Sequence, residues 1–217
     1  MGEGWVEGNM EQIAFNQQND VEILSRETVY KSFTQVDVVK LKHRLFAGGI
    51  SPVIQREMVI KPEAIGVLIY DSVLDAVLLI EQFRVGALPE TNPWQLEIVA
   101  GLVDGQGESL EAVAHREVQE EAGVTLSRLE RVMTFLLSPG GSNERFTLFV
   151  GQADLSPVKT GDLHGLPEEG EDIRVNVMTT SKALNLLNED ILFNAPLLIS
   201  LQWLGLNQKN LQTRWQK

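Results

Sequence analysis

The sequence of 217 residues contains no cysteine and only three histidines, and these absences exclude several kinds of chemistry. Without cysteine there is no disulfide, no thiolate zinc site and no cysteine nucleophile. The histidines, His43, His115 and His164, show no spacing typical of paired metal ligands. Any metal site must therefore be built from oxygen ligands, which favours magnesium, calcium or manganese.

Positively charged residues are also scarce, since 18 lysines and arginines face 30 aspartates and glutamates and leave a net charge of −12. Nucleic acids and anionic membranes are polyanions, so an acidic surface disfavours both as partners. A small anionic substrate remains compatible with this charge, because a bound divalent cation reverses the local field.

Long apolar runs are absent as well. The longest stretches, residues 64–70 and 76–80, have the length of strands and are too short to cross a bilayer as helices. Residues 1–19 lack the basic start and apolar run of a secretory signal. We therefore predict a cytoplasmic protein that binds neither nucleic acid nor membrane.

The length fits one domain with an added subdomain. Residues 1–20 are polar and glycine-rich and are expected to form a loose leader. Alternation of apolar and basic residues over 39–45, followed by Gly48 and Gly49, indicates strands and a turn, so we expect a small antiparallel β subdomain over 21–60. The main domain is then residues 61–217.

Strands and helices follow one another in the main domain without a regular βαβ rhythm. This order favours α/β or α+β layers over a doubly wound parallel sheet. The expected strands are 64–70, 76–82, 94–99, 129–137, 145–152 and 173–179. A glycine-rich loop is expected over 101–107, and helices are expected over 109–122 and around 182–188 and 197–206.

The helix predicted over 109–122 carries acidic residues on the face that should be buried. On a helical wheel of about 100° per residue, Glu117 and Glu121 lie within about 20° of the centre of the apolar stripe around Leu110, and Glu120 lies about 60° further round. Burying such carboxylates together is costly unless a cation joins them. The alternative is a solvated acidic helix, but these residues lie on the wrong face for that. A bound magnesium ion would resolve the conflict.

The same helix lies within a longer pattern of fixed spacing, E-x7-R-E-U-x-E-E-x-G-U, where U is a bulky aliphatic residue. Its fixed positions are Glu108, Arg116, Glu117, Glu120, Glu121 and Gly123. This pattern resembles the Nudix box. One departure is that six residues, and not five, separate Gly101 from Glu108, which we interpret as a one-residue insertion in the loop over 104–107.

The resemblance extends over all but about the first twenty residues. Segments 81–84, 94–101, 138–144 and 164–172 are similar to the bacterial ADP-ribose pyrophosphatases, and Pro139, sixteen residues after Gly123, marks the nucleotide-sugar branch. The resemblance implies a Nudix fold of mixed β-sheets sandwiched between helices. It also implies hydrolysis of the pyrophosphate bond of ADP-ribose and related nucleoside diphosphate sugars, giving AMP and ribose 5-phosphate.

For the chemical centre, the resemblance implies metal ligands and a general base. Two or three Mg²⁺ ions, with Mn²⁺ as an alternative, would be held by the Ala100 carbonyl and by Glu117, Glu120, Glu121 and Glu171. Arg116 would hold these carboxylates through ion pairs. Glu169, in an acidic loop over 166–172, aligns with the base that activates water, although such a loop can equally be a solvated acidic segment.

For the substrate, the resemblance implies Arg84 and Glu97 beside the nucleotide sugar, and Arg56 and Lys61 on phosphate or sugar oxygens. Further substrate contacts fall on Leu102, Ser138, Gly140 and Glu144. Phe33 is the candidate for stacking on adenine across a homodimer with shared active sites, formed through the N-terminal subdomain; packing in a core is its alternative. His164 and Trp94 are assigned to packing.

Two other functions stay open. The Nudix box reads only pyrophosphate and metal, so another nucleotide sugar such as GDP-mannose or ADP-glucose is a second candidate. A non-catalytic sensor of ADP-ribose is a more distant one, because such relatives usually lose the carboxylates that this chain keeps.

Overall fold

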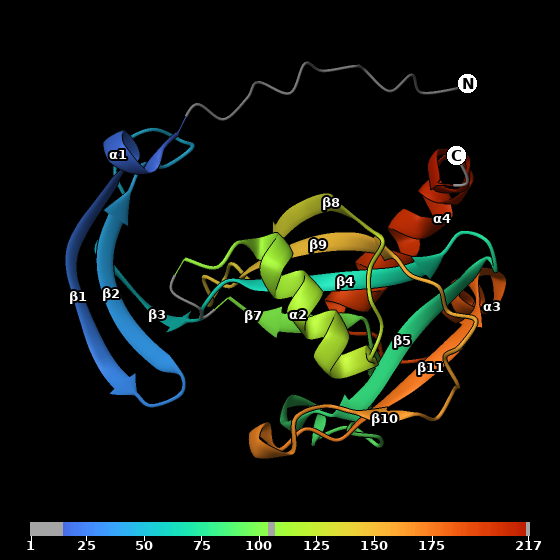
Figure 1. The fold of residues 1–217 in the computed structure, drawn as a ribbon. Helices are drawn as coiled ribbons and strands as arrows, with labels where there is room; N and C mark the ends of the chain where they lie inside the picture. The colour runs from blue at the N-terminus through green and yellow to red at the C-terminus, as the bar shows by residue number, and fades with distance from the viewer. Residues whose placement is uncertain (1–14, 104–106, 216–217) are drawn as a thin grey trace, which may run out of the picture. The chain divides into compact units, whose positions relative to one another are not determined.

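The computed structural model describes residues 15–103 and 107–215, and its chain divides into two units (Figure 1). The N-terminal unit contains the described residues up to Lys61 together with Gly140–Asn143, and the second unit contains Pro62–Pro139 and the residues from Glu144 onward. The sequence prediction keeps 140–143 in the main domain. The structure joins this segment to the N-terminal unit through the Val59 amide, which donates to the Gly141 carbonyl at 2.8 Å.

The N-terminal unit is a three-stranded antiparallel sheet in the order β1-β2-β3, as expected for a small β subdomain. Its strands are β1 (Val21–Lys31), β2 (Gln35–His43) and β3 (Ile54–Ile60). A single helical turn, α1 (Gln17–Asp20), precedes β1 and is capped by the Asn16 side chain. This turn includes residues 17–20 of the expected leader, while residues 1–14 lie outside the described part of the chain.

The second unit is built on a mixed sheet in the order β10-β11-β5-β4-β9-β8. The central strand β4 (Ala64–Asp71) is buried along its whole length, pairs in parallel with β9 (Arg145–Gln152) and pairs antiparallel with β5 (Ala76–Phe83). Burial on both faces explains why its sequence is a continuous apolar run. The remaining strands of this path are β8 (Arg128–Leu136), β10 (Leu163–His164) and β11 (Ile173–Thr179).

The segment expected as one strand over 94–99 is two strands that separate at Ile98. β4 and β5 pair only where Ile69–Asp71 faces Ala76–Leu78, and along the rest of these facing edges each strand pairs with a different neighbour. β6 (Trp94–Glu97) pairs with β5, and β7 (Val99–Leu102) pairs with β4. Gly101 and Leu102, which the sequence prediction places in a loop, therefore belong to β7, and residues 104–106 lie outside the described part.

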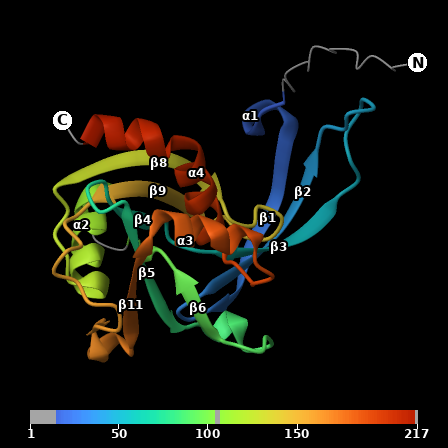
Figure 2. The ribbon, with the colours of Figure 1, turned by 90° about the vertical axis from the view of Figure 1, so that its right-hand side faces the viewer.

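Helices cover both faces of this sheet, which confirms the expected mixed sheet between helices (Figures 1 and 2). α2 (Leu110–Ala122) packs on one face, where Val113 and Val118 meet Ile65 and Val67. α3 (Thr180–Asn185) and α4 (Ala195–Trp215) pack on the other face of the sheet. There Leu201 is buried in one cluster with the residues of β4 that point to this face. α4 extends well beyond the predicted 197–206. Short 3-10 helices are η1 (Val85–Ala87), η2 (Pro167–Glu169) and η3 (Leu186–Asn188).

None of the helices in the described ranges is long and apolar enough to cross a membrane.

Candidate active site

The glutamates of interest are presented by α2, whose two ends are determined by local contacts. The Ser109 side chain caps the start by accepting a hydrogen bond from the Ala112 amide at 3.2 Å. Gly123 ends the helix in the left-handed region at φ 65°, where glycine is favoured. These boundaries agree with the predicted helix over 109–122, and they set the register of Glu117, Glu120 and Glu121.

Glu121 is the most deeply buried of the three, with 2% of its surface exposed. Its Oε2 accepts a hydrogen bond from the Ala100 amide of β7 at 3.0 Å. Burial raises the pKa of Glu121 to about 8, and the charges of Glu117 and Glu171 add to this effect, while the bond from Ala100 opposes it. The site therefore contains a buried carboxylate that lacks an ion-pair partner among the described residues.

Glu117 lies under β7 at Gly101, and it is 12% exposed. A Cβ atom at Gly101 would lie 2.0 Å from Glu117 Oε1, so only glycine at this position leaves room for the carboxylate. The extra residue between Gly101 and Glu108 thus does not separate Gly101 from the helix. Burial raises the pKa of Glu117 to about 7, with Glu120 and Glu171 adding to it and Arg116 opposing it.

Arg116 links the carboxylates of the box. Its Nη1 lies 3.0 Å from Glu117 Oε1 and 2.9 Å from Glu120 Oε2, and its Nε lies 3.7 Å from Glu108 Oε1. A guanidinium between three carboxylates lowers their mutual repulsion and keeps them in one orientation.

The acidic loop contacts α2 at its N-terminal end and is closed on itself by a bond between Leu166 and Glu171. The Gly165 amide donates to the Glu120 carbonyl at 3.2 Å, and Glu171 Oε2 accepts from the Leu166 amide at 3.0 Å. Because the charge of Glu171 raises the pKa of both Glu117 and Glu121, the structure brings Glu171 to the carboxylate set. Glu169 is exposed on η2, and its carboxylate makes no hydrogen bond or ion pair within the described residues.

Arg84 lies beside this set at the end of β5. Its Nε and Nη2 lie 2.9 Å and 2.7 Å from Glu97 Oε2. Burial alone would lower the pKa of the Arg84 guanidinium, but the bond to Glu97 and the charges of Glu97, Glu121 and Glu171 outweigh it and raise that pKa. The structure therefore gathers Arg84, Glu97, Glu171 and the glutamates of α2 in one region of the second unit.

These residues fit a hard divalent cation. Every candidate side-chain donor is a carboxylate oxygen, and Gly101 leaves space beside the Glu117 carboxylate. No three Asp, Glu or His side chains in residues 15–103 and 107–215 converge closely enough to form a complete ligand set. Magnesium needs only one or two carboxylates and completes its shell with water and phosphate oxygens, so the arrangement suits magnesium better than a metal that requires an all-protein cage.

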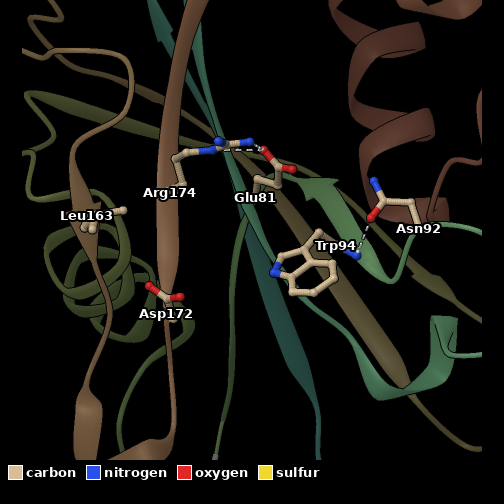
Figure 3. A pocket seen from close by; sticks show the side chains of 6 residues that line it. All are labelled: Glu81, Asn92, Trp94, Leu163, Asp172 and Arg174. Atoms are coloured by element: carbon tan, nitrogen blue, oxygen red, sulfur yellow. Dashed lines mark hydrogen bonds and ion pairs between the residues drawn. The ribbon is translucent and has the colours of Figure 1, made fainter.

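A cleft of about 460 Å³ opens on the face of the sheet that lies opposite to α2, and Figure 3 shows the side chains that line it. Its lining residues are Glu81, Asn92, Trp94, Leu163, Asp172 and Arg174. Glu81 shares its strand face with Leu79, which packs toward α4, so this cleft is separate from the glutamates of α2.

Trp94 is 52% exposed here and meets Phe83 edge to face, so the prediction that Trp94 is a packing residue is only half correct. The His164 ring packs against Gly123.

Comparison with known proteins decides the family. A model of the NUDIX domain matches residues 60–198. The chain is 43% identical over 198 residues to an ADP-ribose pyrophosphatase of Escherichia coli, covering 91% of this chain and 93% of the relative. It is 42% identical over 212 residues to that of Haemophilus influenzae, covering 96% of each.

The chain belongs to the Nudix family. It is therefore a hydrolase of pyrophosphate bonds, and α2 is its Nudix helix. A GDP-mannose pyrophosphatase of Cronobacter sakazakii is 31% identical over 154 residues, covering 70% of this chain and 78% of the relative. A crystal structure described as an ADP compounds hydrolase matches with a TM-score of 0.61 at 23% identity, covering 86% of this chain and 95% of that one, which supports the fold.

The other residues expected to bind substrate in this Nudix protein are divided between the units. Ser138 is exposed after β8, Glu144 is half-buried before β9, and Leu102 packs against the core on the α4 side of the sheet. Phe33, Arg56, Lys61 and Gly140 belong to the N-terminal unit.

Within the N-terminal unit, Phe33 and Lys61 are brought together. Phe33 is 87% exposed, which rules out the alternative of a core aromatic, and Lys61 Nζ lies 5.8 Å from its ring centre. Arg56 Nη1 donates to the Gln55 carbonyl at 2.8 Å.

Sequence reasoning missed Asn194, which contacts Glu97 from the start of α4. An asparagine before an apolar helix is a recognisable capping signal. The signal predicts a cap but says nothing of a second contact with a strand almost a hundred residues earlier.

Proposed function

We propose that this Nudix hydrolase cleaves the pyrophosphate bond of ADP-ribose with magnesium, giving AMP and ribose 5-phosphate. The observation that carries the proposal is the carboxylate set of buried Glu121 and half-buried Glu117 and Glu171, with Arg84 beside it. An anionic diphosphate would approach such a set only with cations between them. The choice of ADP-ribose is supported by the relatives at 42% and 43% identity, whose names give that substrate.

Arg84 is suited to bind the diphosphate. Glu97 occupies Nε and Nη2, and within the described residues Nη1 has no partner. The Glu97 pair therefore fixes the plane of the guanidinium while leaving one donor edge for a substrate oxygen.

Two or three magnesium ions, or Mn²⁺ in their place, would be held by Glu117, Glu120, Glu121 and Glu171 and by the Ala100 carbonyl. When bound, the metal would neutralise the charge of the pyrophosphate and lower the pKa of the attacking water. Arg116 keeps Glu117 and Glu120 in place by its ion pairs.

Glu169 is the proposed general base. Water adds to one phosphorus, the bond from that phosphorus to the bridging oxygen breaks, and the carboxylate of Glu169 takes the proton that the water loses. In the structure Glu169 is exposed, next to Gly170 at φ 74°, while Gly165 before the loop is bonded to α2 and Leu166 is bonded to Glu171 across the base of the loop. A segment anchored at its ends with an exposed tip is suited to close over bound substrate.

The test is a panel of ADP-ribose, ADP-glucose and GDP-mannose, incubated with the full chain with and without Mg²⁺ and analysed by product chromatography. We expect ADP-ribose to have the highest kcat/KM, with AMP and ribose 5-phosphate as products and no turnover without a divalent ion. Faster hydrolysis of GDP-mannose would favour the second candidate, which the relative from Cronobacter supports. Tight ADP-ribose binding without hydrolysis of any compound would favour the sensor.

A further inference from the structure

The carboxylate of Glu97 is held from several directions, although it lies on β6 and not on α2. Its Oε2 accepts hydrogen bonds from Arg84 Nε at 2.9 Å and from Gln82 Nε2 at 3.4 Å. Its Oε1 accepts one from Asn194 Nδ2 at 3.2 Å. With the side chain 12% exposed and both oxygens in use, the carboxylate is restricted to one orientation, and Arg84 is oriented by it.

Asn194 directly precedes α4 and uses every polar atom of its side-chain amide. Oδ1 accepts a hydrogen bond from the Leu197 amide at 2.9 Å, which is the geometry of a helix cap. Nδ2 donates to the Leu96 carbonyl at 3.2 Å and to Glu97 Oε1 at 3.2 Å. Because the oxygen is committed to the helix, the nitrogen must face β6, so the hydrogen bonds determine which way the amide points.

Capping alone does not explain why this residue is asparagine. Serine and aspartate cap a helix about as well, so either would satisfy α4. Serine has a single, shorter hydroxyl in place of separate acceptor and donor atoms, and aspartate would bring another negative charge against Glu97. Of these three residues, only asparagine offers one atom that accepts from the helix and a separate atom that donates to the carboxylate.

Arg84 connects this contact with the chemical centre, because the charges of Glu121 and Glu171 act on it. We infer that Asn194 is a positioning residue for substrate binding, which holds Glu97 so that Arg84 presents its remaining donor edge to the diphosphate. This inference rests on the proposed function, in which Arg84 contacts the nucleotide sugar.

The first test compares Asn194→Ser and Asn194→Asp, which keep the cap, with Asn207→Ser as a matched control. Asn207 is also on α4, where Nδ2 donates to the Trp203 carbonyl at 2.8 Å, away from Glu97. With ADP-ribose and Mg²⁺, we expect both Asn194 variants to raise KM about tenfold and to change kcat by less than about threefold, because ground-state binding is lost. Asn207→Ser should leave both constants unchanged, and all three proteins should melt within about 4 °C of the wild type.

A double-mutant cycle separates positioning from a general effect on α4. In an Arg84→Lys background, Asn194→Ser should change KM by less than about twofold, since the arginine that it positions is gone. An equal rise of KM in both backgrounds would mean that Asn194 acts by another route, and the inference would be wrong.

A readout without substrate distinguishes failure of this inference from failure of the proposed function. The NMR signal of Arg84 Nε–H, assigned by its loss in Arg84→Lys, should exchange with solvent at least about tenfold faster in Asn194→Ser and unchanged in Asn207→Ser. If the wild type leaves ADP-ribose intact but the signal responds, the proposed function fails and the positioning contact stands. If the signal does not respond, the inference is overturned whatever the substrate.

Discussion

At the scale of single residues, the buried carboxylate of Glu121 serves the proposed metal chemistry but destabilises the metal-free fold. Its carboxylate is buried under β7 with one hydrogen bond from Ala100 and two like charges nearby. Glu121→Gln is nearly isosteric and keeps an oxygen for that bond, so we expect the protein to fold. Because a metal-bound charge is lost, turnover should fall below about a tenth of the wild type. Glu111→Gln, an exposed change in the first turn of the same helix, is the control and should retain full activity.

The same residue predicts how the stability of the metal-free protein depends on pH. The pKa of Glu121 is about 8 in the folded protein against an ordinary value of 4.5. Between these values the unfolded chain has released the proton while the folded protein keeps it. The free energy of unfolding should therefore fall as pH rises from about 4.5 to 8, by at most about 1.4 kcal/mol per pH unit for this one proton.

Urea denaturation with a chelator at pH 5 to 8.5 measures this slope. In Glu121→Gln the slope should be smaller, and the variant should be more stable than the wild type at pH 8. Glu111→Gln should keep the wild-type slope, because Glu111 is exposed. A slope that is identical in all three proteins would contradict the burial of an ionisable group at position 121.

Gly101 tests the packing of the Nudix helix against β7. In Gly101→Ala the new methyl group would lie 2.0 Å from Glu117 Oε1, so the carboxylate must move. We expect kcat/KM to fall by about 10²-fold or more and the Mg²⁺ concentration for half-maximal rate to rise. Gly86→Ala, where nothing lies within 4 Å of the new atom, is the matched control. If Gly101→Ala has the same magnesium dependence as the wild type, Glu117 is not a ligand of the metal.

At the scale of elements, the acidic loop offers two exposed carboxylates on η2, Glu168 and Glu169, and a half-buried one, Glu171. Glu169→Gln should lower kcat by about 10²–10⁴-fold with little change in KM, because a base acts in the transition state. Glu168→Gln, on the same 3-10 turn, should have little effect. Glu171→Gln should raise the Mg²⁺ requirement, since the charge of Glu171 acts on Glu117 and Glu121.

Rate, KM and magnesium dependence of these three variants, measured under identical conditions, check the assignment. If Glu168→Gln loses activity while Glu169→Gln keeps it, the alignment of the loop is off by one residue and Glu168 is the base. Wild-type behaviour of all three would place the base elsewhere, with Glu120 as the next candidate.

At the scale of the whole molecule, the N-terminal unit predicts a homodimer. Among its described residues only Asp37, Val39 and Ser51 are buried, and a three-stranded sheet needs one covered face to be stable. β1 exposes large apolar side chains at Ile23, Leu24, Val29 and Tyr30. We expect a second copy to cover this surface, with each N-terminal unit contributing to the partner's site.

Light scattering at micromolar concentration should give twice the chain mass of 24.2 kDa. Val29→Glu should weaken the dimer at least about tenfold and reduce activity with it, whereas the charge reversal Glu27→Lys, on the same strand, should not. A fully active monomer would contradict the prediction.

The sequence alone determined the elements whose signals are local. The ends of α2 follow from Ser109 and Gly123, and the placement of Glu117 and Glu121 on its buried face follows from helical periodicity. Membership of the Nudix family could also be predicted from the spacing of the box residues, because one helix carries most of the residues that the chemistry needs.

Only the tertiary structure decided the contacts between distant segments. The separation of β6 from β7 at Ile98 arises because β4 and β5 diverge, which no local signal reveals. The fit of Glu117 against Gly101 and the bond from Asn194 to Glu97 join elements far apart in the chain. The joining of 140–143 to the N-terminal unit is of the same kind. Helix ends depend on neighbouring residues, whereas these contacts depend on how sheets and helices pack, and that is determined by the whole chain.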